Sequence, residues 1–203
     1  MENINNIIFD LGGVILTLNM PETERLLSSH GITSYNQLFR SGNVSDFFEA
    51  YEVGKIDDGT FLQSLKKLTD KEVSDAQLIH AWNAMLGVFP EERISLLQSL
   101  KERYRLFLFS NTNALHVKEI RDRYTNTYRT RFDDLFEKTY YSNELGLRKP
   151  NVASFQHILH REGLIPSETA FVDDSLANVE AAEAAGIKGI HVKPGMTILD
   201  IPF

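Results

Sequence analysis

Short apolar runs recur along the chain at intervals that predict a parallel β-sheet. Five of them have the character of strands, at residues 4–9, 105–109, 137–140, 170–172 and 189–192. The segments between the later runs carry apolar residues at helical spacing, bounded by residues typical of helix starts and stops. These boundary residues are Pro90, Asn113, Asn151, Ser175, Gly163 and Gly186. Because strands alternate with helices, we predict an α/β fold: a Rossmann-like parallel-sheet core with helices on both faces.

One interval breaks this alternation. Between the first two runs an extra stretch of about 70 residues intervenes, roughly residues 17–88, whereas a simple crossover helix needs about a dozen. Apolar residues recur there at helical spacing over residues 22–30, 44–53, 60–68 and 75–86, with glycine-containing turns between them. We therefore predict an inserted segment, residues 17–88, that forms a helical-bundle cap on a core made of residues 1–16 and 89–203.

Polar side chains follow the predicted strands. They are Asp10 after the first strand, Ser110 and Asn111 after the second, Lys149 after the third, and Asp173 and Asp174 after the fourth. Taken singly, each fits a helix cap, a solvated loop or a turn. Since ligands bind beyond the carboxyl ends of strands in such sheets, we expect these side chains to converge on one site.

Three carboxylates at one sheet edge need a positive charge between them. Two carboxylates about 4 Å apart repel by about 4 kcal/mol at an effective dielectric constant near 20. Lys149 can offset one charge, and a set of hard oxygen donors without histidine or cysteine suits Mg²⁺. Such a site would hold a phosphate ester against Asp10 as the nucleophile, with Ser110, Asn111 and Lys149 binding the phosphate oxygens.

Composition excludes some classes of binding partner and indicates a cellular compartment. The 203 residues, 42% of them hydrophobic, can bury a sizeable core. With 21 basic and 28 acidic residues the chain offers no basic patch, so we expect neither nucleic acid nor membrane as a partner. The absence of cysteine excludes disulfides and thiolate metal sites. The N-terminus lacks the cationic lead of a signal peptide, and we expect a cytoplasmic protein with no evident protein partner.

Four ordered motifs resemble those of the haloacid dehalogenase-like hydrolases, in the phosphatase branch with a helical cap after the first strand. They read FDLGGVI, LFLFSNT, GLRKP and FVDDSLANVEAAEAAGI, and together they span nearly the whole chain. The cap stretch YEVGKIDDGTF also looks like a segment of capped members. The resemblance implies that Asp10 attacks phosphorus to form an aspartyl-phosphate, which water then cleaves.

The resemblance also implies roles for neighbouring residues. It places Mg²⁺ on Asp10, the main-chain carbonyl of Gly12 and Asp174, with Asp173 and Asn178 in the outer shell. Ser110 and Lys149 match the phosphate-binding residues of the family. The implied activity is that of a phosphoric monoester hydrolase acting on a small phosphorylated metabolite, with a sugar phosphate as the favoured class.

Gly12 departs from the common family pattern, which has a second aspartate two residues after the nucleophile. The missing side chain removes a general acid/base worth about 10²- to 10⁴-fold in rate. Resembling sugar-phosphate phosphatases also carry glycine there, which indicates a subgroup trait, with slower catalysis or a better leaving group. We interpret His116 as a packing residue rather than a substitute acid. Gly12 and Gly13 suit a tight turn beside the ligand.

Substrate choice is expected to lie in the inserted segment. Asn19, Phe47, Tyr51 and Trp82 could line a pocket there, although packing within the cap is the preferred interpretation for the three aromatic residues. Three other functions stay open at this point. They are a metal-free 2-haloacid dehalogenase, a non-catalytic phosphate-binding module suggested by Gly12, and, ranked last, a response-regulator receiver. The crowded aspartates argue against the dehalogenase, whose chemistry needs no metal.

Overall fold

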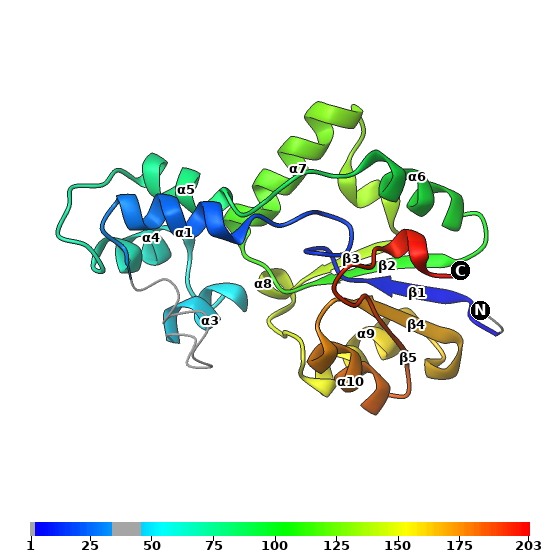
Figure 1. Cartoon of the computed structure of the whole chain (residues 1–203). Helices are drawn as coiled ribbons and strands as arrows, with labels where there is room; N and C mark the ends of the chain where they lie inside the picture. The colour runs from blue at the N-terminus through cyan, green and yellow to red at the C-terminus, as the bar shows by residue number, and fades with distance from the viewer. Residues whose placement is uncertain (1–2, 34–45) are drawn as a thin grey trace.

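A five-stranded parallel sheet forms the centre of the fold (Figure 1). The structure is a computed structural model that describes residues 3–33 and 46–203. The strands are β1 (Asn6–Phe9), β2 (Arg105–Ser110), β3 (Lys138–Tyr141), β4 (Thr169–Asp173) and β5 (Lys188–His191), in the order β3-β2-β1-β4-β5. Neighbouring strands pair in parallel, and β1 lies at the centre between β2 and β4. All five predicted strands are present, with ends shifted by up to two residues.

The sheet is covered on both faces, as predicted. Alternate residues of a strand point to opposite faces, so Ile7 and Phe9 of β1 join one apolar cluster while Ile8 joins the other. Helices α6 (Glu91–Leu100) and α7 (Ala114–Tyr128) cover the first face, and α9 (Val152–Glu162) and α10 (Leu176–Ala184) cover the second (Figure 1). The short elements are α8 (Ser142–Leu145), η1 (Phe132–Leu135), η2 (Pro166–Glu168) and η3 (Ile198–Asp200).

Most of the predicted helix boundaries are confirmed. The side chains of Asn113 and Asn151 accept hydrogen bonds from main-chain N–H groups in the first turns of α7 and α9. Gly163 ends α9 with φ of 63°, in the left-handed region that favours glycine. One detail was wrong: Pro90 precedes α6 instead of lying in its first turn. Ser175 is the N-cap residue of α10, as predicted, but its side chain makes no capping hydrogen bond.

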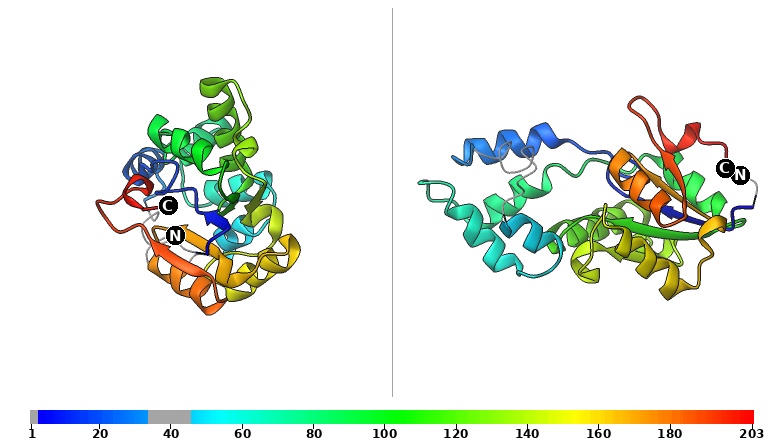
Figure 2. Two further views of the ribbon diagram at one scale, coloured as in Figure 1. Left: turned by 90° about the vertical axis from the view of Figure 1, so that its right-hand side faces the viewer. Right: turned by 90° about the horizontal axis from the view of Figure 1, so that it is seen from below.

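The inserted segment is helical where it is described. Its helices are α1 (Met20–Ser29), α3 (Asp46–Glu52), α4 (Asp58–Lys66) and α5 (Asp75–Asn83). Residues 44–45 of the predicted helix 44–53 lie outside the described residues. Helix α4 starts two residues earlier than predicted because the Asp57 carboxylate caps it by accepting a hydrogen bond from the Thr60 N–H group at 2.8 Å. These helices lie beyond the carboxyl ends of the strands, while both termini lie at the other end of the molecule (Figure 2).

Two linkers join the inserted segment to the sheet, and they run antiparallel to each other. Leu18 and Leu86 form a β-bridge, and the main-chain N–H of Thr17 donates to the carbonyl of Val88 at 3.0 Å. This pairing explains why α5 ends at Asn83 and not at residue 86 as predicted. No helix in the ranges 3–33 and 46–203 has the length and apolar character needed to cross a membrane.

Aromatic side chains form the interior of the inserted segment. Tyr51 stacks on Phe61 with ring centroids 4.1 Å apart, and Phe61 also contacts Phe47 and Trp82. The packing interpretation of Phe47, Tyr51 and Trp82 agrees with these contacts. Asn19 is exposed and precedes α1 without capping it through its side chain.

Candidate active site

Lys149 is buried between two carboxylates at the carboxyl ends of the central strands. Its Nζ atom donates to Oδ1 of Asp10 at 2.6 Å and to Oδ2 of Asp173 at 2.7 Å. Strands β1 and β4 are neighbours with Phe9 opposite Val172, so the next residues of the two strands lie side by side. The lysine side chain is 1% exposed. A fully buried ammonium group needs such ion pairs to offset the loss of hydration.

Asp173 is held by hydrogen bonds on both of its carboxylate oxygens. Oδ1 accepts from the main-chain N–H of Ser175 at 2.7 Å, and Nδ2 of Asn178 lies 3.1 Å from each oxygen. Lys149 binds Oδ2, and the residue is completely buried. Asp173 is therefore suited to orienting its neighbours, which fits the outer-shell position predicted for it and for Asn178.

Asp174 brings a third carboxylate to the same place. Asp10, Asp173 and Asp174 each offer an oxygen that lies within 4.8 Å of the other two. Asp174 is exposed, whereas the other two are buried. Gly13 makes room for it, because a Cβ atom on Gly13 would lie 2.3 Å from Oδ2 of Asp174. With φ of 77°, Gly13 also adopts a backbone conformation that other residues rarely take.

The charges in this cluster do not balance. Burial raises the pKa of Asp10 to about 7, although the ammonium group of Lys149 acts in the opposite direction. Burial and the charge of Asp173 raise the pKa of Asp174. Burial alone would lower the pKa of Lys149, but the charges of Asp10 and Asp173 outweigh it and raise that pKa. Three carboxylates around one ammonium group leave an excess of negative charge that a divalent cation would neutralise. Because all the donor atoms are oxygens, Mg²⁺ is a suitable cation.

The loop after β2 supports the lysine. The side chain of Asn111 bonds the main chain of Lys149 twice: Nδ2 donates to the carbonyl and Oδ1 accepts from the N–H, both at 2.9 Å. The side chain that we predicted to bind phosphate is thus engaged in holding Lys149. Ser110 ends β2, is 4% exposed and lines a cavity next to the carboxylate cluster. Thr112 and Ser142 pair through the Ser142 hydroxyl, a contact that we did not anticipate.

A cavity of about 230 Å³ is lined by residues of this cluster and of the linkers. Its polar lining residues include Asp10, Ser110, Asn111, Lys149, Asp174 and Asn178. Its apolar lining residues include Leu16, Leu18, Met85, Leu86 and Ile120. No sequence pattern placed Leu18, Met85 and Leu86 at the site, because these residues come together only where the two linkers pair. Of the four residues considered for substrate binding, none is among the described residues that line this cavity.

His116 borders the cavity but has both ring nitrogens engaged. Nδ1 lies 3.1 Å from Nδ2 of Asn113, an amide donor, so Nδ1 accepts. Nε2 then carries the proton and donates to the carbonyl of Trp82 at 3.2 Å. Burial lowers the pKa of His116 to about 4. The ring is therefore neutral at pH 7 and joins α7 to the inserted segment, in agreement with the packing interpretation.

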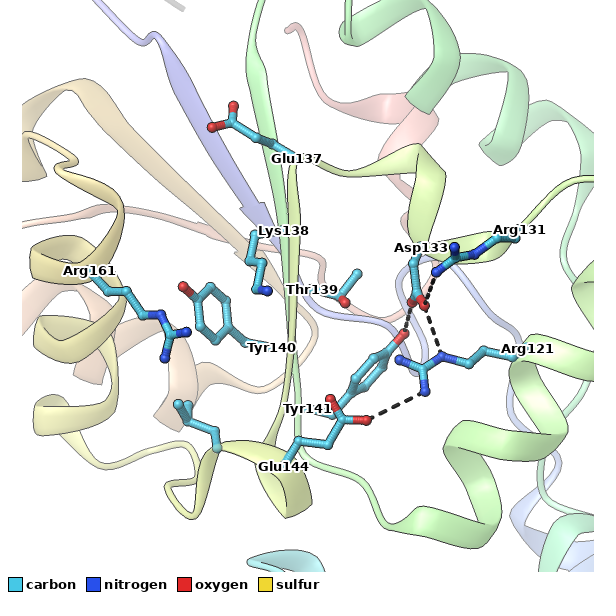
Figure 3. Close-up of a pocket in the computed structure, with 11 residues that line it drawn as sticks. Arg121, Arg131, Asp133, Glu137, Lys138, Thr139, Tyr140, Tyr141, Glu144 and Arg161 are labelled. Carbon is cyan, nitrogen blue, oxygen red and sulfur yellow. Dashed lines mark hydrogen bonds and ion pairs between the residues drawn. The ribbon is translucent and has the colours of Figure 1, made fainter.

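A second cavity, of about 420 Å³, lies at the open edge of β3 (Figure 3). Several of its charged groups pair with one another: Nε of Arg121 lies 2.9 Å from Oδ2 of Asp133, and Nη1 of Arg121 lies 3.5 Å from Oε1 of Glu144. The Tyr141 hydroxyl donates to the other oxygen of Asp133 at 2.8 Å. The described residues that line it include none of the carboxylate cluster, so we do not place the chemistry there.

Comparison with known proteins agrees with this geometry. The family described as haloacid dehalogenase-like hydrolase matches residues 4–186. The chain is 27% identical over 195 residues to D-ribitol-5-phosphate phosphatase of Bacteroides thetaiotaomicron, covering 95% of this chain and 93% of that one. It is 30% identical to a sesquiterpene phosphatase of Aspergillus oryzae, covering 91% of this chain and 88% of the relative.

Solved structures agree as well. A haloacid dehalogenase family enzyme of Bacteroides thetaiotaomicron, in complex with magnesium and inorganic phosphate, superimposes with a TM-score of 0.88 at 32% identity. The match covers 95% of this chain and 96% of that one. A 2-haloacid dehalogenase of Pseudomonas syringae, at 18% identity and a TM-score of 0.59, shares the fold alone. The chain belongs to the haloacid dehalogenase-like hydrolases.

Proposed function

We propose that the protein is a Mg²⁺-dependent phosphatase that hydrolyses a small phosphorylated metabolite, with sugar phosphates as the substrate class. The observation that carries the proposal is the buried Lys149, which joins Asp10 to Asp173 beside Asp174 in the lining of a cavity. The phosphatase relatives, and the related structure that holds magnesium and phosphate, support it.

Asp10 is the nucleophile in this mechanism. Its carboxylate attacks phosphorus in line with the leaving oxygen, the P–O bond breaks, and an aspartyl-phosphate forms. The Ser110 hydroxyl donates to a non-bridging oxygen, while the ammonium group of Lys149 favours the ionised form of Asp10 and orients its carboxylate. Water then attacks the aspartyl-phosphate at phosphorus, releases phosphate and regenerates the Asp10 carboxylate.

The metal would be held by Asp10, Asp174 and the main-chain carbonyl of Gly12. When bound, Mg²⁺ supplies positive charge that offsets the charge developing on the phosphoryl group. Asp173, which accepts hydrogen bonds from Ser175 and Asn178, would act in the outer shell and orient the groups that hold the metal. Asn111 contributes by fixing the main chain of Lys149.

The domain division that we propose assigns residues 1–16 and 89–203 to the catalytic core and residues 17–88 to a helical cap. The paired linkers carry Leu18 and Leu86 into the cavity, so movement of the cap relative to the core would change the volume next to the substrate. Closure excludes water from the reacting phosphate in such arrangements. A cytoplasmic location suits the cysteine-free sequence.

The other candidate functions fit less well. Displacement of halide needs no metal, and the excess of carboxylates around Lys149 would then have no counter-charge. A non-catalytic phosphate-binding module would not need a carboxylate beside the bound phosphate, where like charges repel. Asp10 lines the cavity, where it would face the phosphate.

Phosphate release from 4-nitrophenyl phosphate tests the proposal directly. We expect activity in Mg²⁺, loss of activity with a chelator, and recovery on adding Mg²⁺ back. Asp10→Asn should abolish turnover while the circular dichroism spectrum and thermal unfolding stay close to those of the wild type. Activity of Asp10→Asn equal to wild type would exclude the assigned nucleophile, and halide release that resists chelation would favour the dehalogenase.

A panel of phosphorylated metabolites would then test the substrate class. The panel should contain sugar and sugar-alcohol phosphates together with an isoprenoid phosphate, because the two phosphatase relatives differ in the polarity of their named substrates. We expect the highest kcat/KM among the sugar phosphates. A clear preference for the isoprenoid ester would replace the proposed class while leaving the phosphatase assignment intact.

A further inference from the structure

Arg123 of α7 binds the segment that leads from the inserted helices back to the core. Its Nη1 group donates to the main-chain carbonyl of Leu86, and also to that of Gly87 at 3.4 Å. Its Nη2 group donates to the carbonyl of Asn83, the last residue of α5, at 3.4 Å. One guanidinium group thus holds both the end of α5 and the second linker, residues 84–88.

An arginine suits this position for two reasons. The carbonyl groups in the last turn of a helix lack their usual helical partners, and that end of a helix carries a partial negative charge that favours a cation. The planar guanidinium group also presents several donors in fixed directions, whereas a lysine offers a single point charge. The carboxylate of Glu119 accepts from Nε of Arg123 at 2.6 Å and orients the group.

The peptide group between Leu86 and Gly87 is bonded on both sides. Its N–H donates to the carbonyl of Thr17 at 2.9 Å, and its carbonyl accepts from Arg123. Because the N–H and C=O of a trans peptide point in opposite directions, the second linker lies between the first linker, residues 17–19, and α7. A Cβ atom on Gly87 would lie 2.6 Å from the carbonyl oxygen of Thr17, so the two main chains are in direct contact.

Other residues on the same face of α7 hold the end of α5. Asn113, His116, Ile120 and Arg123 follow one another at intervals of three or four residues, which places them along one side of the helix. Oδ1 of Asn113 accepts from Nε1 of Trp82 at 3.3 Å, and His116 donates to the carbonyl of Trp82. Arg123 continues this row of contacts from the end of α5 into the second linker.

The second linker carries two apolar side chains into the site. Met85 and Leu86 are 8% and 6% exposed, and they line the same cavity as Asp10. Arg123 is not among the described residues that line this cavity. Any effect of Arg123 on a molecule in the cavity is therefore exerted through the linker that it holds.

We propose that Arg123 is a positioning residue for substrate binding: it fixes the second linker, and the linker places Met85 and Leu86 in the cavity. This inference rests on the phosphatase function proposed above, which puts a phosphate ester in the same cavity beside Asp10. Because the cavity holds only about 230 Å³, the organic part of the ester shares its space with the linker side chains. Loss of Arg123 should weaken binding of the organic part and leave binding of the phosphate group unchanged.

Arg123→Met tests the inference, because it removes the three carbonyl contacts and keeps an unbranched apolar side chain. With 4-nitrophenyl phosphate we expect KM to rise about tenfold while kcat changes by less than about twofold, since ester and transition state lose the same contact. The Ki of inorganic phosphate as a competitive inhibitor should stay within about twofold of the wild type, because phosphate has no organic part. A variant that is merely less stable would lose active enzyme, which lowers kcat and leaves KM unchanged.

Arg121→Met is the matched control. Arg121 lies on the same helix and is 39% exposed, against 36% for Arg123, but it pairs with Asp133 and Glu144 instead of the linker. Its KM should stay within about twofold of the wild type. Arg123→Lys keeps the positive charge without the planar group, so it should also raise KM, and it provides the same test if Arg123→Met does not fold.

Leu86→Ala shows whether Arg123 acts through the linker. Alone it should raise KM several-fold, and its effect should not add to that of Arg123→Met, because both changes disturb the same wall of the cavity. Additive effects, or equal KM values in the folded Arg123 variant and in Arg121→Met, would overturn the inference. Failure of the proposed function would look different: the wild type would release no phosphate from 4-nitrophenyl phosphate in Mg²⁺.

Discussion

Gly13 and Asp174 fit together only because residue 13 has no side chain: a Cβ atom there would lie 2.3 Å from Oδ2 of Asp174. Gly13→Ala should therefore push the Asp174 carboxylate away from Asp10. We expect Mg²⁺ activation to require at least about tenfold more metal, since one ligand of a hard-cation site is displaced. The measurement is phosphate release as a function of Mg²⁺ concentration.

Gly163→Ala is the matched control for this substitution. Gly163 has a similar positive φ of 63°, but no atom lies within 4 Å of its added Cβ. Both variants should lose about 1 to 2 kcal/mol of unfolding free energy through backbone strain. Only Gly13→Ala should change the Mg²⁺ dependence, and an unchanged dependence in Gly13→Ala would contradict the assignment of Asp174 to the metal.

Lys149→Met should destabilise the fold as well as stop turnover. Removal of the ammonium group leaves two buried carboxylates without their cation, a change that costs about 3 to 5 kcal/mol when one member of a buried pair is lost. Urea unfolding without Mg²⁺ measures this loss, and Mg²⁺ should restore part of it by neutralising the same carboxylates. Lys118→Met, at a side chain that is 80% exposed, should change stability by less than about 1 kcal/mol. Equal losses of unfolding free energy in the two variants would show that Lys149 does not stabilise the fold by neutralising the buried carboxylates.

His116 should make the stability depend on pH. Its pKa is lowered to about 4 in the folded protein from 6.5, chiefly by burial, so the unfolded chain binds a proton that the folded chain does not. Stability is therefore full above pH 6.5 and falls as the pH drops toward 4, by about 3 kcal/mol. Unfolding free energies of the wild type and His116→Gln between pH 4 and 7 provide the test. The variant should have the smaller slope, and parallel curves would exclude a neutral buried His116.

The ion pair between Glu52 and Arg148 should affect substrate binding. Oε2 of Glu52, in the inserted segment, lies 3.1 Å from Nη2 of Arg148, the residue before Lys149. The two side chains are 23% and 27% exposed, so a double-mutant cycle with Glu52→Gln and Arg148→Met should give a coupling of about 0.5 to 1 kcal/mol. We expect KM to rise several-fold with a smaller change in kcat, because the pair joins the inserted segment to the loop that carries Lys149.

The ion pair between Lys66 and Asp75 is the control for that cycle. It lies wholly within the inserted segment, at 2.5 Å, and both side chains are exposed. Lys66→Met should leave KM unchanged. If KM responds equally to the loss of either pair, the Glu52–Arg148 contact has no special link to the site.

The sequence alone predicted the architecture and most of the residues that meet at the site. Strand and helix periods are local properties of the chain, so the five strands, their helices and the helical insertion followed from the pattern. Parallel strands carry their carboxyl ends to one edge, which is why Asp10, Lys149 and Asp173 could be expected together before any distance was known.

Only the tertiary structure decided which role each side chain has at the site. Asn111 was expected to face phosphate, yet its amide bonds the main chain of Lys149, because the β2 and β3 loops pack side by side. In the sequence, Leu18 is an isolated apolar residue in a linker, and no local pattern predicted that it would line the cavity. It enters the cavity through its pairing with Leu86, a contact between positions far apart in the chain that no local period encodes.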